Sequence, residues 1–158
     1  MKRAGRALGV VTRHPGLRVD RPSVAAAVGV LDAHAGEFRG GCPPGELSIA
    51  FLTDADLAGL HGRFLGDNSS TDVITFGGDA AHGTAGEICV SADAAVRIAG
   101  RGARRLSAEL TLYVVHGWLH LSGYDDRDPA SRRAIRGAES RAMRLLSRSA
   151  SVPRFGLA

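Results

Sequence analysis

Residues 107–126 read SAELTLYVVHGWLHLSGYDD, and this stretch decides the fold. Ser107 is expected to cap a helix, because its hydroxyl can accept a hydrogen bond from a free amide of the first turn. Glu109 follows in that turn, where a negative charge suits the helix dipole. Gly123 is expected to end the helix, since glycine takes the left-handed conformation without strain. The residues between are apolar on nearly every side, so we predict a buried central helix to Leu121.

Two histidines in this helix predict a metal site. His116 and His120 are four residues apart, so their imidazoles project from one face. Both ring nitrogens could therefore reach one ion at about 2.0–2.1 Å. Unsatisfied imidazoles in a buried helix would be costly, and a metal or strong hydrogen bonds would remove that cost. Beyond Gly123 the chain can turn back, so Asp125 or Asp126 could supply a third ligand and leave a fourth position for water. We expect one divalent ion, zinc, in a hydrolytic site.

The residue after the first histidine argues against peptide hydrolysis. Proteases of the His-Glu-x-x-His type carry their general base at that position, which here is Gly117. Two other acids are candidate proton carriers: Asp125, beside the ligand, and Glu109, if the fold brings it close. Asp125 could instead form a turn or orient a ligand, and Glu109 could be a helix-start charge. We give preference to these structural roles.

Working outward, hydrophobic periodicity and turn residues predict the remaining elements. Strands are expected at 8–12, 46–52, 73–76 and 86–90. Helices are expected at 22–34, 53–64, 91–100 (beginning at Ser91 or Asp93), 107–121 and 129–147. With 158 residues in total, the pattern predicts a single α+β domain over 1–150 and a C-terminal tail over 151–158. The domain should hold a four-stranded mixed sheet packed with about five helices, and the metal site should lie on a central helix.

The bulk composition is typical of a globular protein, with 44% apolar and 23% charged residues. No stretch approaches the roughly eighteen apolar residues needed to cross a bilayer. The basic start is followed by an apolar run over only 7–11, too short for a signal peptide, so we expect a cytoplasmic location and no membrane partner. Cys42 and Cys89 lie far apart, which predicts two reduced thiols, with Cys89 in a strand.

The charge balance favours polyanionic partners such as RNA, since the net charge is +4. Nearly all the positive charge is arginine, and a GC-rich genome is the preferred explanation of that bias, so charge alone is weak evidence for RNA. Four arginines before the histidine helix could line an RNA path or simply form a solvated helix end: Arg97, Arg101, Arg104 and Arg105.

The run HGWLHLSGYD at 116–125 resembles the signature of the YbeY family, bacterial metal-dependent endoribonucleases of ribosomal RNA maturation. TDVITF at 71–76 is similar to the family's Thr-Asp-Val-Leu-Ser-Phe strand. GEICVS at 86–91 is similar to its Gly-Asp-Ile-x-Ile-Ser strand. Glu109 and Glu139 also fall where the family has glutamates. The likeness covers roughly 47–146, and its histidine signature is the most specific part.

The resemblance implies a single-strand-specific, metal-dependent endoribonuclease. Its substrate would be precursor ribosomal RNA, including the 3′ end of the small-subunit RNA, and it would also serve ribosome quality control. The implied cofactor is one zinc ion, held by His116, His120 and the residue at the third ligand position. The implied partners are RNA, the small ribosomal subunit and ribosome-associated proteins.

The third ligand position departs from the family pattern. The family usually has His-x3-His-x5-His, and here the last position is Asp126. A carboxylate oxygen coordinates zinc at about 2.0–2.2 Å, so a site survives. Its negative charge should make the ion a weaker Lewis acid, and it could admit harder ions such as manganese or magnesium.

A second departure lies upstream. The family often has Tyr-Arg-Gly-Lys-Asp-x-Pro-Thr, whose arginine is thought to contact RNA or stabilise charge. Aligned on Thr71, this chain has Leu65 in place of the arginine and Ser70 in place of the proline. Arg63, two residues away, is the candidate substitute, although local geometry could equally point it elsewhere.

Three functions remain open from the sequence. The first is the endoribonuclease that the resemblance implies. The second is a metallohydrolase of another substrate, with the peptide version disfavoured by Gly117. The third is a catalytically weak, metal-stabilised RNA- or ribosome-binding module, which the loss of the family arginine would suit.

Overall fold

The computed structural model describes residues 5–65 and 72–158. Within these ranges, it describes all side chains except those of residues 61–65. Its strands are β1 (Leu8–Thr12), β2 (Leu17–Val19), β3 (Glu46–Leu52), β4 (Val73–Gly77), β5 (Thr84–Ser91) and β6 (Phe155–Leu157). Its helices are α1 (Arg21–Ala33), α2 (Asp54–Leu65), α3 (Ala92–Ala99), α4 (Ala103–Leu121) and α5 (Pro129–Arg148), with short 3-10 turns at Ala35–Glu37 and Ala80–His82.

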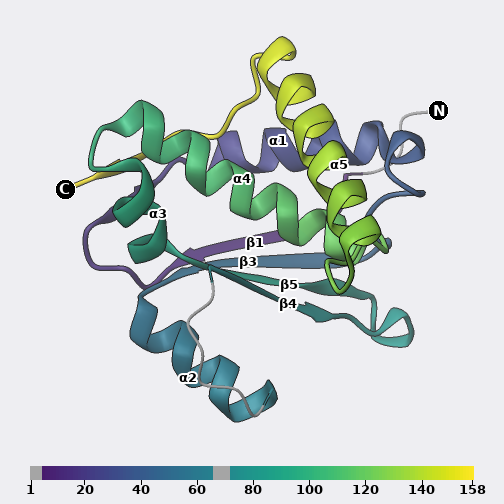
Figure 1. The fold of residues 1–158 in the computed structure, drawn as a ribbon, viewed down its shortest axis with the longest axis horizontal. Helices are drawn as coiled ribbons and strands as arrows, with labels where there is room; N and C mark the ends of the chain where they lie inside the picture. Colours follow the sequence, from purple (N-terminus) through teal and green to yellow (C-terminus); the bar gives the residue numbers. More distant parts are fainter. Residues whose placement is uncertain (1–4, 66–71) are drawn as a thin grey trace.

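Four strands form the main sheet in the order β1-β3-β5-β4 (Figure 1). The pairs β1–β3 and β3–β5 are parallel, and β4 runs antiparallel to β5 at the edge. The expected α+β domain with a four-stranded mixed sheet and five helices is therefore confirmed for the described residues. None of the helices described is both long and apolar enough to cross a bilayer.

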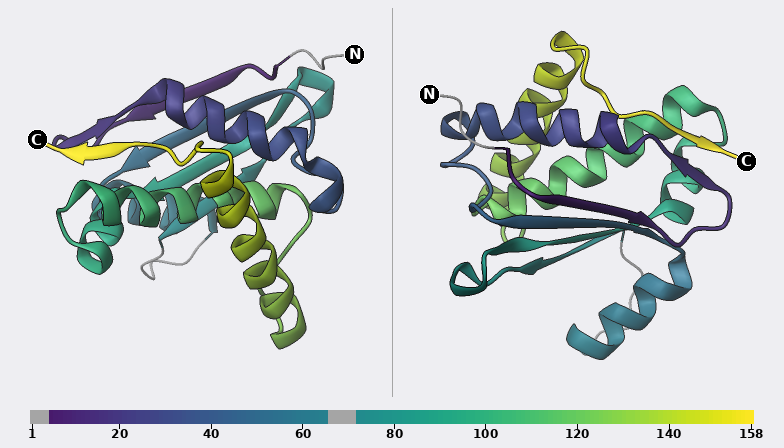
Figure 2. Two further views of the ribbon diagram at one scale, coloured as in Figure 1. Left: turned by 90° about the horizontal axis from the view of Figure 1, so that it is seen from above. Right: turned by 180° about the vertical axis from the view of Figure 1, so that it is seen from behind.

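The helices cover the two faces of the sheet unequally. In Figures 1 and 2, α1, α4 and α5 lie over one face, whereas α2 lies under the other. The main core fills the first face and includes the fully buried Leu47, Ile88 and Trp118. A small second cluster under α2 holds Leu57 and Cys89 with three further side chains. The long helix α4 is thus the central element between the sheet and the outer helices.

Two contacts fix the position and rotation of α4. A Cβ atom at Gly117 would lie 2.5 Å from Cγ2 of Ile88, so the absence of a side chain lets α4 pack directly on β5. On the opposite side, the indole of Trp118 donates a hydrogen bond of 3.1 Å to Asp32 of α1. Arg6 in turn forms a 2.6 Å ion pair with Asp32. The helix is therefore held from both sides at the level of its histidines.

The start of α4 differs from expectation. The prediction that Ser107 caps the helix is wrong, because α4 begins four residues earlier with Gly102 as its cap. The hydroxyl of Ser107 instead accepts a 2.9 Å hydrogen bond from the amide of Phe155. Phe155 is buried in the core, and its strand β6 pairs with β2 in a separate two-stranded sheet. The segment expected as a tail thus contributes a strand, and this second sheet was not expected.

Both cysteines are free, as the sequence predicted, and Cys89 lies on β5. Both are also buried. Burial raises the pKa of the Cys42 thiol to about 11 and that of Cys89 to about 12. Neither side chain is therefore a thiolate at neutral pH, and neither is placed to act as a nucleophile.

Candidate metal centre

The two histidines of α4 face each other one helical turn apart. Nε2 of His116 lies 2.9 Å from Nε2 of His120, and the ring centroids are 4.5 Å apart. Their side chains are only 26% and 22% exposed. Burial lowers the pKa of His120, and the neighbouring His116 lowers it further. Both effects favour the neutral imidazole, which is the form that binds a metal.

Asp126 reaches the same point from the loop after α4. Gly123 takes a φ of +100°, which turns the chain back, and the amide of Tyr124 bonds to the carbonyl of Leu119 at 3.1 Å. Tyr124 is buried beneath the guanidinium of Arg39, which anchors the turn. Oδ2 of Asp126 consequently lies 3.9 Å from Nε2 of His116 and 3.7 Å from Nε2 of His120.

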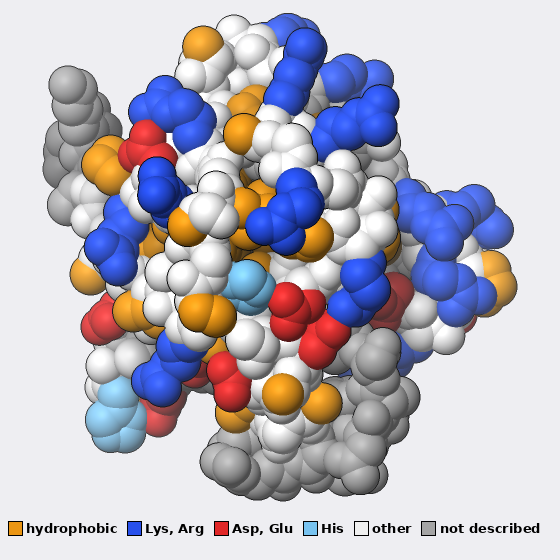
Figure 3. Space-filling view, turned by 90° about the vertical axis from the view of Figure 1, so that its left-hand side faces the viewer, with side chains coloured by type: hydrophobic (Ala, Val, Ile, Leu, Met, Phe, Trp, Pro, Cys, Tyr) orange, Lys and Arg blue, Asp and Glu red, His pale blue; other side chains and the backbone are white. Residues whose placement is uncertain are grey.

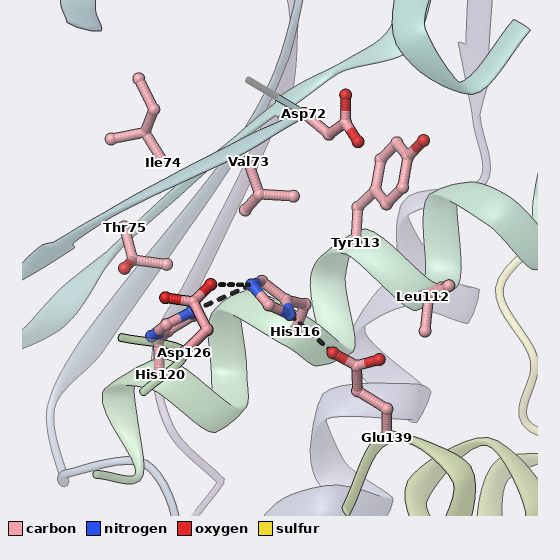
Figure 4. Close-up of a pocket in the computed structure, with 10 residues that line it drawn as sticks. All are labelled: Asp72, Val73, Ile74, Thr75, Leu112, Tyr113, His116, His120, Asp126 and Glu139. Atoms are coloured by element: carbon pink, nitrogen blue, oxygen red, sulfur yellow. Dashed lines mark hydrogen bonds and ion pairs between the residues drawn. The ribbon is translucent and has the colours of Figure 1, made fainter. Parts of the chain in front are cut away.

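Glu139 of α5 orients the first histidine. Its Oε1 lies 2.6 Å from Nδ1 of His116 (Figure 4), and the carboxyl side chain is only 17% exposed. A carboxylate only accepts hydrogen bonds, so Nδ1 of His116 carries the proton in this contact. Its Nε2 then presents a lone pair toward Asp126. A carboxylate behind a histidine in this way is the usual outer partner of a metal ligand.

The geometry fits a single divalent ion. Ligand atoms of His116, His120 and Asp126 all lie within 4.8 Å of one another, so this group could hold a metal. Ligands about 2.0–2.1 Å from a tetrahedral zinc lie roughly 3.3 Å apart, and the three distances above bracket that value. Two neutral imidazoles and one carboxylate also form a common donor set of catalytic zinc sites, which leaves a further position open.

The three donors line a cavity of about 430 Å³ between α4 and β4. Val73, Ile74 and Thr75 form the strand side of this cavity, as Figure 4 shows. Asp72, Leu112, Tyr113 and Glu139 complete the lining. The close contact at Gly117 leaves no room for a glutamate after the first histidine, which supports the argument against a protease of the His-Glu-x-x-His type.

Two of the other candidate residues, Asp125 and Glu109, are not among those that line the cavity. Asp125 accepts a 3.0 Å hydrogen bond from the amide of Arg127, which is a turn-forming contact, and it does not line the cavity. Glu109 lies nearly two turns before His116 and near the hydroxyl of Tyr113. Arg63 belongs to α2, but its side chain lies outside the described residues, as does that of Leu65.

Sequence reasoning did not find three polar residues of this cavity. Glu139 was noted only as a family position, because nothing in the spacing of α5 indicates a partner 23 residues away. Asp72 was seen only within a strand motif. Tyr113 resembled one more buried residue of the central helix, and no sequence signal distinguishes it from Val114 or Val115.

Arginines cover much of the surface around the helices. Arg97 is paired with Asp54, whereas Arg101, Arg104 and Arg105 are exposed. Figure 3 shows arginine side chains over the upper part and along both sides of one face, with most acidic side chains lower down. Closer to the metal ligands, Arg132 donates a 3.3 Å hydrogen bond to the carbonyl of Asp126.

Comparison with known proteins identifies the family. A family model described as Endoribonuclease YbeY matches residues 23–147. A relative of that name from Anaeromyxobacter dehalogenans is 36% identical over 129 residues, covering 78% of this chain and 67% of the relative. Another from Chlamydia abortus is 38% identical over 109 residues, covering 64% of this chain and 69% of the relative. A third from Rhodopirellula baltica is 38% identical, with 67% and 56% covered.

The fold is shared with a solved structure as well. The solution structure of a Thermotoga maritima protein superposes with a TM-score of 0.56 at 18% identity, covering 91% of this chain and 92% of the other. At that identity the likeness concerns the fold alone. The family match over most of the chain agrees with the histidine signature of 116–125 and with the geometry that it produces. This chain therefore belongs to the YbeY endoribonuclease family.

Proposed function

We propose that this protein is a metal-dependent endoribonuclease that cleaves single-stranded RNA and acts on ribosomal RNA precursors, including the 3′ end of the small-subunit RNA. Family membership supports the activity. The observation that carries the proposal is the convergence of three donors, His116, His120 and Asp126, in an open cavity, with Glu139 behind one of them. We extend it to ribosome quality control, ribosomal partners and a cytoplasmic location on the resemblance alone.

His116, His120 and Asp126 would hold the ion, with zinc as the first choice and manganese or magnesium as alternatives because of the carboxylate. When bound, the ion would supply charge stabilisation at the phosphodiester and lower the pKa of a coordinated water. The contact with Glu139 keeps Nε2 of His116 free to coordinate. Asp126, whose side chain is 53% exposed, marks the side from which RNA would enter.

The residues proposed for proton transfer and for charge stabilisation are chosen by their positions in the sequence. Asp125 is adjacent to the ligand in sequence, so it is the nearer candidate proton carrier, although its contact with the amide of Arg127 also suits a turn. Glu109 is the more distant candidate. We retain Arg63 as the candidate that stabilises charge on phosphate, resting on its place in the sequence.

The RNA backbone would approach over arginines. Four exposed arginines lie between the metal loop and the first turns of α5: Arg127, Arg132, Arg133 and Arg136. Arg101, Arg104 and Arg105 could extend this path at the start of α4. Phosphate contacts of this kind release counterions, so affinity should fall steeply as salt increases.

The test is cleavage of a single-stranded RNA by the wild type and by His120→Ala, each with and without a chelator. His82→Ala is the matched control, because His82 is exposed and paired with Asp79 away from the cavity. We expect cleavage by the wild type and the control that chelator abolishes, and no cleavage by His120→Ala. RNA binding without cleavage under any added metal would support the binding module instead, and cleavage of non-RNA substrates alone would support another hydrolase.

A further inference from the structure

A second cavity lies toward the other end of α4 from the metal ligands. It is a groove of about 790 Å³ formed by the start of α4, the end of α5 and residues 152–155. Figure 1 shows the chain running from the end of α5 back past the start of α4. Ser107 of the groove precedes His116 by nine residues, which is about 14 Å along a helix axis. No lining residue is shared with the metal cavity, so the two are separate sites.

The lining of this groove is mainly apolar. Pro153 and Phe155 are buried, and Met143 and Val152 are half-buried beside them. The hydroxyl of Ser107 is already engaged, because it accepts a hydrogen bond from the amide of Phe155. An apolar groove beside helices is a common docking place for an amphipathic segment of another protein.

The rim of the groove is positively charged. Arg104 stands on α4 and Arg144 on α5, and both are exposed. A third arginine, Arg154, is paired with Asp20 at 2.6 Å. Among the described residues, no ion pair involves Arg104 or Arg144, and no acidic side chain lines the groove. The groove therefore offers an available cation on each of two helices, with apolar surface between them.

This combination distinguishes among possible occupants. RNA would match the charge, but single strands are usually held by stacking bases on aromatic rings, and the one aromatic residue described in the lining, Phe155, is only 5% exposed. A second copy of this chain would bring its own net charge of +4 to a positive surface. A small molecule with one anionic group would leave one of the two arginines without a partner. A peptide with several carboxylates and apolar side chains satisfies both features.

We propose that this groove binds an acidic amphipathic segment of a partner protein. The apolar side chains of the segment lie against Met143 and Val152, and its carboxylates pair with Arg104 and Arg144. Opposite charges across such an interface speed association and disfavour partners of like charge. Because the groove is separate from the metal centre, the partner and a substrate can be bound at the same time.

The test uses three fluorescein-labelled peptides of equal length as probes. The first places Leu and Glu in a helical amphipathic pattern, the second has Ser in place of each Leu, and the third has Lys in place of each Glu. Binding to the full-length protein is measured by fluorescence anisotropy. We expect saturable binding of the Leu/Glu peptide alone, and its affinity should fall as salt increases.

Two variants of the rim test the charge. Arg104→Glu and Arg144→Glu should each weaken binding of the Leu/Glu peptide by roughly threefold to tenfold, since each removes one ion pair and adds a repulsion. Arg133→Glu is the matched control, because Arg133 is exposed on the same helix as Arg144 but does not line the groove. It should bind the peptide as the wild type does. Binding of oligouridylate in chelator is measured in parallel for all four proteins.

Several results would overturn the inference. A wild type that does not bind the Leu/Glu peptide saturably would do so. Equal binding of the Ser-containing peptide would reduce the effect to charge alone, and binding of the Lys-containing peptide would exclude charge complementarity. An equal loss of peptide affinity in Arg133→Glu would show that the groove is not the site. A loss of oligouridylate affinity in Arg144→Glu without a loss of peptide affinity would assign the groove to RNA.

Discussion

The two halves of the metal centre are built in different ways. His116 and His120 stand on a helix packed against β5, with side chains about three-quarters buried. Asp126 stands in a loop, and its side chain is 53% exposed. The histidine nitrogens are 2.9 Å apart, whereas the carboxylate lies 3.7 and 3.9 Å from them.

The helical half is therefore the more rigid part of the metal centre, and the loop half is the more adaptable part. The helical half is held by the core through Trp118 and Gly117 and by Glu139 at its back. The loop half depends on a glycine turn and on contacts of Tyr124. We expect the helical half to set whether a metal binds, and the loop half to adjust its strength and the identity of the ion.

Breaking the helical half should have the largest effect. His120→Ala removes one of two neutral donors, so metal affinity should fall by more than the roughly 10- to 100-fold that loss of an outer partner costs. Elemental analysis of the purified variant, with His82→Ala alongside, measures this. Full metal content in His120→Ala would contradict the assignment of the pair.

Displacing the helical half should have a smaller effect. Gly117→Ala places a Cβ atom 2.5 Å from the Ile88 side chain and 3.1 Å from Cγ2 of Thr75. The fold should lose about 1–3 kcal/mol, as overpacked cores do. Urea unfolding measures this loss, with Gly137→Ala on α5 as a control, because the nearest atom there is 3.6 Å away in a long side chain. Equal stability of the two variants would count against the close packing of α4 on β5.

Weakening the contact between Glu139 and the helical half should lower metal affinity without unfolding the protein. Glu139→Gln keeps the shape of the side chain but removes its charge, so metal affinity should fall by about tenfold while folding is retained. Competition with a chromophoric chelator reports the affinity directly. An affinity equal to that of the wild type would show that Glu139 does not orient His116.

The smallest expected effect is that of pH on the folding stability of the metal-free protein, through His120 of the helical half. Burial and His116 lower the pKa of His120 below its ordinary value of 6.5. As pH falls through 6.5, the unfolded chain therefore takes up a proton that the folded chain resists, and stability must fall. Urea unfolding of chelator-treated protein should show this loss, and His120→Gln should show a smaller one. If the dependence of stability on pH were unchanged in His120→Gln, the effect would belong to another group.

The same comparison explains what the sequence could predict. A helix has a fixed period, so His116 and His120 could be paired from their spacing alone. Loop residues follow no such repeat, so the sequence alone leaves Asp125 and Asp126 as alternatives for the third ligand. In the structure the carboxylate of Asp126 faces the histidines, whereas that of Asp125 bonds to the amide of Arg127.

Long-range contacts account for most of what the sequence did not indicate. Ser107 looked like a helix cap, but its hydroxyl pairs with Phe155, 48 residues away. The three-residue strands β2 and β6 are too short for an alternating pattern to indicate. The four main strands and five helices were predicted because each carries a local pattern of its own.

The most direct test of the three-donor centre is the metal content of variants at Asp126, the ligand in the loop half. Wild type, Asp126→His and Asp126→Ala should be purified in parallel and analysed for bound zinc and manganese. The account predicts one ion per chain in the wild type, tighter zinc binding in Asp126→His, and a large loss of metal in Asp126→Ala. Metal retained in full by Asp126→Ala would contradict the assignment of Asp126 as the third ligand.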